Sequence, residues 1–191
     1  PGQTILILGA AGGVGIAAIE IAKVMGAKVI AAASSKEKLD FCKKNGADYL
    51  INYESENLKE KIQEITEGKG IDGVYDAVGG KYSETALRAL AWRGKFLVVG
   101  FAAGEIPKIP LNLALLSERS IIGVFWGEWV RRNPEGHRLN MELLSDWFKD
   151  QKISPPVCAT FTLDKAKDAI EHLSSRQALG KVVVEVNKLV T

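Results

Sequence analysis

The sequence predicts a doubly wound α/β fold, in which helices cover both faces of a six-stranded parallel sheet. Three observations support this prediction. Short apolar runs rich in β-branched residues recur between amphipathic stretches; the runs are apolar on both faces, as in strands buried from two sides; and a glycine-rich turn follows the first run. The expected strands are residues 5–8, 29–33, 49–51, 74–77, 96–99 and 121–125.

The segments between these runs have helical spacing. Leu58, Ile62 and Ile65 follow one another at steps of four and three among charged residues, which predicts a helix with one buried face. Two dipeptides mark helix ends. Asn45-Gly46 suits a left-handed C-terminal cap, and Asn133-Pro134 supplies an N-cap followed by proline in the first turn.

The alternation changes after Phe125. A helix with an apolar stripe at Leu139, Leu143 and Trp147 leads into an extended connection at 153–156, where two prolines exclude a central strand. A smaller unit follows, predicted as strand 157–162, a helix carrying Ala166, Ala169, Ile170 and Leu173, and strand 181–186. Two strands and a helix are too few for an independent core. We therefore divide the chain into a domain at 1–150 and a tail at 151–191.

Composition excludes several classes of function. The chain has 191 residues, of which 47% are hydrophobic. Its 25 Lys and Arg are nearly balanced by 23 Asp and Glu and form no basic block, so no nucleic-acid partner is expected. No apolar run reaches the ~20 residues of a membrane helix, so no membrane partner is expected. Cys42 and Cys158 are too few and too far apart for a disulfide framework or a metal site. We expect a soluble, cytoplasmic protein with reduced cysteines and no bound metal.

The glycine-rich turn between the first strand and its helix predicts a dinucleotide site. The pattern is Ala10-x-Gly12-x-x-Gly15, with Gly9 just before it, and the segment also contains Gly13 and Val14. Glycines let backbone amides approach a pyrophosphate, and a helix N-terminus favours negative charge. A later register, from Gly13, would start inside the helix. The alternative to a dinucleotide site is a tight structural turn with close helix packing.

The end of the second strand favours NADP over NAD. An NAD site has a carboxylate there for the ribose 2′-hydroxyl, whereas this chain has Ser34 and Ser35, followed by Lys36 and Lys38. Hydroxyl and ammonium groups can hydrogen-bond and neutralise a 2′-phosphate. Ser34 with Glu37 is also a capping box for the next helix, and the lysines also suit an ordinary solvated surface.

Several ordered phrases give the chain a family resemblance. Beyond the glycine turn and the Ser-Ser-Lys segment, they are Ile51-Asn52-Tyr53, Tyr75-Asp76-Ala77-Val78-Gly79-Gly80, Val98-Val99-Gly100-Phe101 and Gly180-Lys181-Val182. The chain resembles the zinc-independent quinone oxidoreductases of the medium-chain dehydrogenase/reductase superfamily, whose nucleotide domain is a Rossmann fold. The resemblance implies that Ser34, Lys38, Tyr53 and Arg176 hold the 2′-phosphate of NADPH. Without it, Tyr53 reads as a strand-end aromatic residue and Arg176 as a surface charge.

The ends of the fourth and fifth strands lie where a dinucleotide crosses such a sheet. Val78, Gly79, Gly100 and Phe101 are therefore expected to flank the nicotinamide half. Phe125, in the phrase Phe125-Trp126-Gly127, is expected to end the sixth strand and either contact the carboxamide or lie in a subunit contact.

The resemblance also implies a homodimer formed by pairing sixth strands, between Ile121 and Phe125. It further implies that an N-terminal barrel-like domain, which the chain lacks, walls the substrate cleft, and that the tail returns to that barrel. Since the chain opens at Pro1-Gly2 without Met, it reads as part of a longer protein.

No catalytic side chain can be named, because the two histidines, His137 and His172, lie in charged helical surroundings without ligand spacing. The cofactor supplies the reactive hydride. The expected function is therefore NADP(H) binding within an enzyme that reduces a quinone, enone or similar conjugated carbonyl, the isolated chain being inactive. The alternative is a non-catalytic NADP-binding sensor or crystallin-like module. A methyltransferase-like domain is disfavoured, since the ribose-binding acid is absent.

Overall fold

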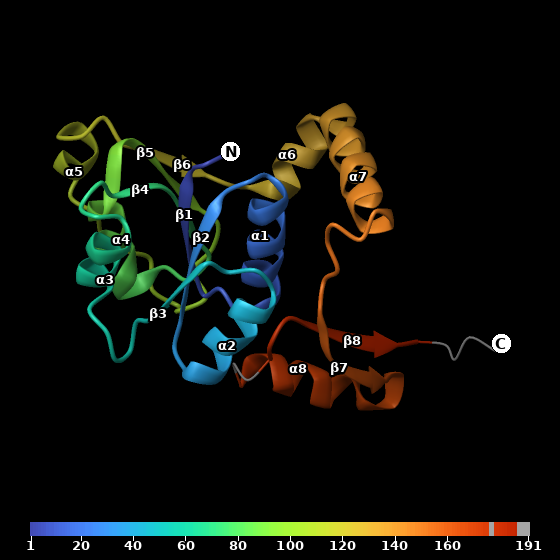
Figure 1. Ribbon diagram of the computed structural model, residues 1–191. Coiled ribbons are helices and arrows are strands. Elements are labelled where there is room, and N and C mark those ends of the chain that lie inside the picture. The colour runs from blue at the N-terminus through green and yellow to red at the C-terminus, as the bar shows by residue number, and fades with distance from the viewer. Residues whose placement is uncertain (176–177, 187–191) are drawn as a thin grey trace.

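The computed structural model describes residues 1–175 and 178–186 and confirms the predicted doubly wound sheet. Six parallel strands lie in the order β3-β2-β1-β4-β5-β6, and β7 and β8 pair in a separate parallel sheet (Figure 1). The strands are β1 Thr4–Leu8, β2 Lys28–Ala33, β3 Tyr49–Asn52, β4 Ile71–Asp76, β5 Leu90–Val98, β6 Ser120–Gly123, β7 Val157–Thr162 and β8 Lys181–Glu185. The helices are α1 Gly13–Val24, α2 Lys36–Lys44, α3 Leu58–Ile65, η1 Gly80–Tyr82, α4 Ser83–Arg88, α5 Asn112–Leu115, α6 Trp126–Arg132, α7 Pro134–Lys149, η2 Leu163–Lys165 and α8 Ala166–Ser174.

Two apolar layers sandwich the large sheet. Helices α3 and α4 lie on one side of the sheet, and α1 and α2 on the other (Figure 1). Successive residues of a strand point to opposite faces, so Leu8 of β1 packs in the layer with α3 and α4, while Ile7 packs in the layer with α1 and α2. Both side chains are fully buried, as are Ile62 of α3 and Ile16 of α1. Each burial contributes about 1.5–3 kcal/mol, which explains why the central strands are apolar on both faces.

The start of α2 differs from the predicted capping box. The N-cap is Ser35, whose hydroxyl accepts from the backbone N–H of Lys38 at 3.3 Å. Ser34, one residue earlier, instead accepts from the Lys38 ammonium at 3.1 Å. The shift by one residue frees Ser34 from capping. The other end of α2 is as predicted, with Asn45 as C-cap and Gly46 in the left-handed region.

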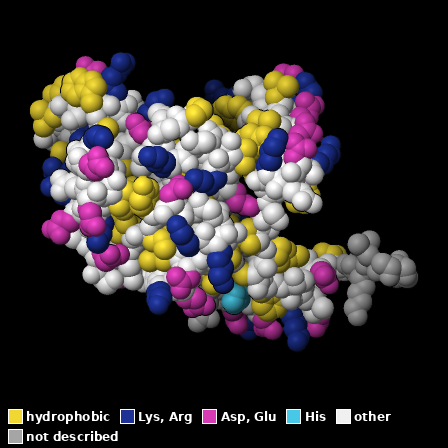
Figure 2. Space-filling model, in the orientation of Figure 1, with side chains coloured by type: hydrophobic (Ala, Val, Ile, Leu, Met, Phe, Trp, Pro, Cys, Tyr) yellow, Lys and Arg dark blue, Asp and Glu magenta, His cyan; other side chains and the backbone are white. Residues whose placement is uncertain are grey.

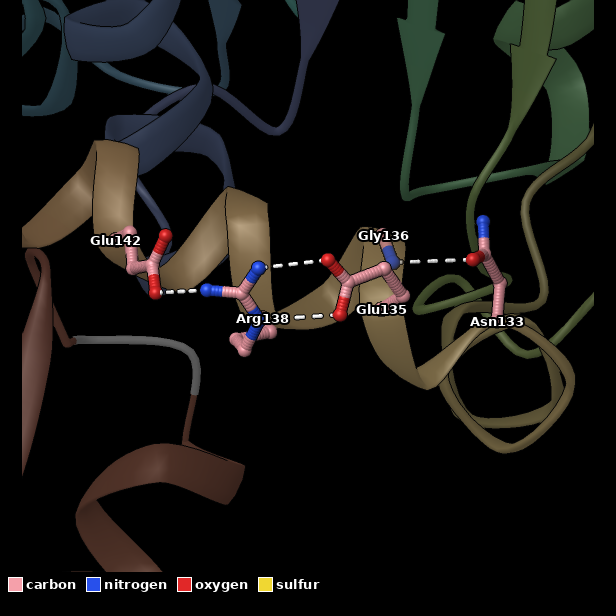
Figure 3. A network of polar contacts seen from close by, with 5 residues as sticks. All are labelled: Asn133, Glu135, Gly136, Arg138 and Glu142. Carbon is pink, nitrogen blue, oxygen red and sulfur yellow. Dashed lines mark hydrogen bonds and ion pairs between the residues drawn. The ribbon is translucent and has the colours of Figure 1, made fainter.

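Helix α7 begins at the predicted signal. The side-chain oxygen of Asn133 accepts from the N–H of Gly136 at 3.0 Å, and Pro134 is the first helical residue (Figure 3). One turn on, the guanidinium of Arg138 pairs with Glu135 at 2.6 Å and also with Glu142 (Figure 3). Exposed pairs of this kind stabilise the helix only modestly.

The sixth strand is shorter than predicted. It ends at Gly123, and after Val124 donates to the carbonyl of Val98 at 2.9 Å the chain turns into α6. Phe125 is therefore the residue before a helix, not the end of a strand. Within α6, Glu128 pairs with Arg131 and Arg132 at 2.6 Å, one turn along the chain, and these exposed pairs stabilise the helix modestly.

The C-terminal unit is attached to the first helix and to the glycine turn. Ahead of it, the extended connection is tied to α1, where Glu20 accepts from the N–H of Ser154 at 2.7 Å. Gly180, before β8, forms a parallel bridge with Gly12 and donates to the carbonyl of Ala11 at 3.0 Å. Within the two described stretches, no helix has the length and apolar character needed to cross a membrane.

Candidate functional site

A cleft opens along the carboxyl ends of the central strands. Two cavities, of about 690 and 230 Å³, share Lys38, Tyr53 and Leu173 as walls, and we call them together the sheet-edge cleft. The larger is also lined by Ser34, Glu54, residues 78–82, Ala102, Ala103, Glu105 and Ser174. The smaller is also lined by Gly9, residues 11–13, Ala33, Ala178 and Gly180. In sheets of this kind, ligands bind where the strand order reverses, here between β1 and β4.

The glycines of the first turn have different physical roles. Gly9 has a φ of +65°, and a Cβ there would lie 2.7 Å from Cγ2 of Val78. Gly15 packs the first turn of α1 against the end of β1, since its Cβ would lie 2.4 Å from the carbonyl oxygen of Gly9. At Gly12 the nearest atom to a Cβ is 3.5 Å away. Gly12 is therefore not required by packing, and it lines the smaller cavity, as expected of a residue over which a phosphate approaches the backbone.

The start of α1 is electrostatically suited to an anion. Its N-cap, Gly12, makes no side-chain capping bond, and its first turn carries no acidic residue. The ammonium of Lys181 lies 3.5 Å from the position a Cβ on Gly13 would take. The positive end of the helix and this cation add their fields at one point. Lys181 was not predicted as a site residue, because only the bridge before β8 brings it to this turn.

The polar end of the larger cavity is formed by Ser34 and Lys38. The 3.1 Å bond from the Lys38 ammonium to the Ser34 hydroxyl holds the two groups together. Among the described residues, the Lys38 ammonium bonds to the neutral hydroxyl of Ser34 and forms no ion pair, so its charge is available to a ligand in the cleft. A hydroxyl beside an ammonium is a donor set that suits a phosphate.

Two tyrosines form another wall. The rings of Tyr53 and Tyr82 lie 4.4 Å apart between centroids, at 36°. The Tyr82 hydroxyl donates to Glu54 at 2.6 Å, and Lys81 lies 3.7 Å from the other oxygen of that carboxylate. Tyr82, Lys81 and Glu54 were not predicted as site residues, since no local pattern distinguishes them from surface groups.

A buried carboxylate shapes the wall after β4. Asp76 is 2% exposed, and its Oδ1 accepts from the N–H groups of Val78 and Gly79, both at 2.8 Å. Its Oδ2 accepts from the hydroxyl of the buried Ser83 at 2.6 Å. Gly79 has a φ of +71°, which glycine adopts without steric cost. Asp76 therefore sets the position of two residues that line the cleft.

The structure brings together part of the predicted set. Residues in the cleft walls are Gly12, Gly13, Ser34, Lys38, Tyr53, Val78 and Gly79. Residues outside those walls are Ala10, Val14, Gly15, Ser35, Gly100, Phe101 and Phe125. Of these, Ala10 is fully buried, Ser35 caps α2, and Phe125 is 78% exposed. Arg176 lies outside the described residues.

Comparisons with known proteins relate the chain to dehydrogenases and quinone oxidoreductases. The family model described as "Zinc-binding dehydrogenase" matches residues 13–143. The chain is 40% identical over 190 residues to a quinone oxidoreductase-like protein 2 homolog of Nematostella vectensis, covering 98% of this chain and 52% of that protein. The chain spans about half the length of the curated relatives it matches.

Solved structures show the same similarity. A quinone oxidoreductase of Escherichia coli complexed with NADPH superposes with a TM-score of 0.86 at 30% identity, over 97% of this chain and 58% of that one. An NAD-dependent alcohol dehydrogenase superposes with a TM-score of 0.85 at 32% identity, over 98% of this chain and 52% of that one.

Proposed function

Because the chain belongs to the zinc-binding dehydrogenase family, we propose that its sheet-edge cleft binds a nicotinamide dinucleotide and prefers NADPH to NADH. The observation that carries the proposal is the Lys38–Ser34 pair, which places an ammonium and a hydroxyl at the end of β2 with no carboxylate between them. Its relatives and structural neighbours, quinone oxidoreductases among them, support an oxidoreductase. We propose that the whole protein transfers hydride from NADPH to a quinone, enone or similar conjugated carbonyl.

The residues present fit this cofactor. Gly12 leaves room for a pyrophosphate, and the uncapped start of α1 supplies positive potential for it, with Lys181 nearby. Ser34 and Lys38 offer donors to a ribose 2′-phosphate. When bound, the dinucleotide supplies a hydride at its nicotinamide ring. Further residues in the proposed cofactor site are Ala10, Gly13, Val14, Gly15, Ser35, Tyr53, Val78, Gly79, Gly100, Phe101, Phe125 and Arg176.

Nucleotide titration tests the preference. NADPH and NADH are titrated into the chain while tryptophan fluorescence and nucleotide fluorescence are followed, for the wild type and for Lys38→Ala. We expect wild type to bind NADPH more tightly, and Lys38→Ala to weaken NADPH about tenfold or more with little change for NADH, because it removes a charge-assisted contact to the 2′-phosphate. Lys36→Ala, an exposed neighbouring charge outside the cleft walls, is the matched control. Equal affinities that Lys38→Ala leaves unchanged would refute the preference.

We also propose that the 191 residues alone bind NADPH without reducing quinones. No acid, base or nucleophile in the described cleft stands out as catalytic, and the relatives are about twice as long. NADPH oxidation with a quinone acceptor is followed with the purified chain. Robust turnover by the chain would refute this part of the proposal without affecting cofactor binding.

A homodimer through β6 is a further part of the proposal. Neighbouring residues of a strand face opposite sides, yet Ile121 and Ile122 are both more than a third exposed, so the edge and both faces of this strand are open. A second apolar group lies over α5, at the upper left of Figure 2, with Leu111 and Leu115 each more than three-quarters exposed. Light scattering should report a dimer for wild type and a monomer for Ile122→Lys; a monomeric wild type would refute it.

The domain division and location complete the proposal. We propose that residues 1–150 form the nucleotide-binding domain and 151–191 a tail that packs with another domain, supported by the separate β7–β8 sheet. Limited proteolysis should cut the chain first near residue 150, between the proposed domain and the tail. Both cysteines are free, which suits a reducing compartment such as the cytoplasm; fractionation of cells tests that location.

A further inference from the structure

Tyr53 and Tyr82 meet in the sheet-edge cleft from elements that are far apart in the sequence. Tyr53 follows β3 directly, where its N–H donates to the carbonyl of Ala33 at 3.2 Å. Tyr82 ends η1, after β4. Their centroid separation of 4.4 Å, just below the usual range of about 4.5–7 Å for aromatic pairs, puts the rings in close contact. Both side chains also pack against the main apolar layer. Each ring therefore restricts the orientation of the other.

The ring of Tyr82 is held by its own polar partners. Its hydroxyl donates to Oε1 of Glu54 at 2.6 Å, and the Lys81 ammonium lies 4.8 Å from the ring centroid and 3.7 Å from Oε2 of Glu54. Burial, together with the bond to Glu54, raises the pKa of the Tyr82 phenol, so it remains a donor at neutral pH. The same bond, with Lys81, lowers the pKa of the Glu54 carboxyl, so it remains an acceptor.

The anchor of Tyr82 belongs to the same turn as Tyr53. The N–H of Glu54 donates to the side chain of Asn52 at 3.1 Å, and the N–H of Asn52 donates to Glu56 at 2.7 Å. These bonds fix the backbone on both sides of Tyr53. The Glu54–Tyr82 bond then links this turn to the turn after β4. Both contacts of Tyr82, through its ring to Tyr53 and through its hydroxyl to Glu54, are therefore made with the turn after β3.

We infer that Tyr82 is a positioning residue for recognition of the ribose 2′-phosphate. Its ring, anchored by Glu54, fixes the ring of Tyr53 in the wall of the cleft beside Ser34 and Lys38. This inference rests on the proposed function, in which Tyr53 contacts that phosphate together with Ser34 and Lys38. Tyr82 acts through Tyr53 and needs no contact of its own with the phosphate.

The test compares two substitutions at Tyr82. Dissociation constants for NADPH and NADH are measured for the 191-residue chain and for Tyr82→Leu and Tyr82→Phe. Tyr82→Leu removes the aromatic pair, and we expect NADPH to bind about three- to tenfold more weakly while NADH changes less than about twofold. Tyr82→Phe keeps the ring and loses the anchor, so its NADPH affinity should lie between those of wild type and Tyr82→Leu.

Tyr49→Leu is the matched control. It makes the same substitution at the first residue of β3, at the amino end of that strand and outside the walls of the sheet-edge cleft. It should leave the affinities for NADPH and NADH unchanged. Urea midpoints for all variants report folding, and Tyr82→Phe keeps the test decisive if Tyr82→Leu does not fold. An equal loss of NADPH and NADH affinity, or no loss of NADPH affinity in either Tyr82 variant, would overturn the inference. A wild-type chain that binds neither nucleotide would instead refute the proposed function.

Discussion

Gly15 and Gly9 are in direct backbone contact where the first strand turns into the first helix. A Cβ on Gly15 would lie 2.4 Å from the carbonyl oxygen of Gly9 and 2.7 Å from Cα of Ala10. Both neighbours are backbone atoms, which cannot move aside as a side chain can. The close approach of α1 to β1, and therefore the shape of the turn between them, depends on glycine at position 15.

Replacing Gly15 by alanine should destabilise the fold. We expect Gly15→Ala to lower the free energy of unfolding by about 1–3 kcal/mol, because the turn must shift to admit the methyl group. Urea denaturation measures the change. Gly127→Ala, the same substitution in the first turn of α6, has no atom within 4 Å of the new Cβ and should raise stability by up to about 1 kcal/mol. Equal stability of Gly15→Ala and wild type would contradict the packing role.

Gly12→Ala should affect binding more than stability. The φ of Gly12, −72°, is accessible to alanine, and the nearest atom to the new Cβ is at 3.5 Å. We therefore expect a urea midpoint close to that of wild type. Because the methyl group would occupy space over the start of α1, NADPH should bind about tenfold or more weakly under the proposed function. A variant that binds NADPH normally would place the pyrophosphate elsewhere.

The central strands could be predicted because their residues are buried on both faces. Ile7, Leu8 and Ile30 lie in apolar runs, and burial on both faces is typical of strands in a parallel sheet. The end of β6 could not be predicted in this way. Phe125 continues an apolar run, so apolar content alone does not distinguish the last strand residues from the connection to α6, which starts at Trp126.

The candidate site was predictable where its residues follow a strand directly. Ser34 follows β2 directly, Val78 and Gly12 lie in the turns after β4 and β1, and the doubly wound order brings all three to one edge. Lys181 and Tyr82 were missed because they reach the site through contacts between distant segments. A single sequence carries no local pattern for such contacts.

The carboxylate of Asp76 should be important for stability. Asp76→Ala would leave the N–H groups of Val78 and Gly79 and the hydroxyl of Ser83 without this acceptor, and we expect a loss of about 3 kcal/mol or more. Asp76→Asn keeps the oxygen that accepts the two backbone bonds and should cost about 1 kcal/mol. Urea denaturation of both variants distinguishes these values. Similar costs for the two substitutions would mean that the two backbone bonds are not the main contribution.

The two cysteines should differ sharply in reactivity. Burial raises the pKa of the Cys42 thiol to about 12, whereas Cys158 is exposed on β7. A thiol reagent at mildly alkaline pH should therefore modify one thiol per native chain rapidly and the second only after unfolding in denaturant. Cys158→Ser should abolish the rapid phase. Rapid modification of both thiols in the native protein would show that Cys42 is accessible to solvent.

Asp48 should make stability depend on acidity. Partial burial opposes its charged form, but bonds from the Lys23 ammonium at 2.8 Å and from the N–H of Val29 at 2.7 Å outweigh this and lower the pKa of the carboxyl. A carboxyl whose pKa is lower in the folded state stabilises the fold at pH values above its unfolded-state pKa. This stabilisation is lost as the pH falls through the folded-state pKa. Because both ionic groups are about one-third exposed, the contribution should be only about 1 kcal/mol.

The measurement for Asp48 is urea denaturation of wild type and Asp48→Asn at neutral pH and near pH ~3. The variant should be less stable at neutral pH, and the difference should shrink in acid. Glu67→Gln removes a pair with Lys69 in which both side chains are about four-fifths exposed, and it should change stability little at either pH. A difference between wild type and Asp48→Asn that is constant with pH would contradict the assignment.

The bridge between Gly12 and Gly180 joins segments from opposite ends of the chain. Gly180 has a φ of +90°, and a Cβ there would lie 2.6 Å from the carbonyl oxygen of Pro156. Position 180 therefore has no room for a side chain. The glycine turn cannot open without releasing the N–H of Gly180 from Ala11. In hydrogen exchange we therefore expect the first turn and the start of β8 to open together, so that the amide of Gly180 reports local opening of a loop near the other end of the chain.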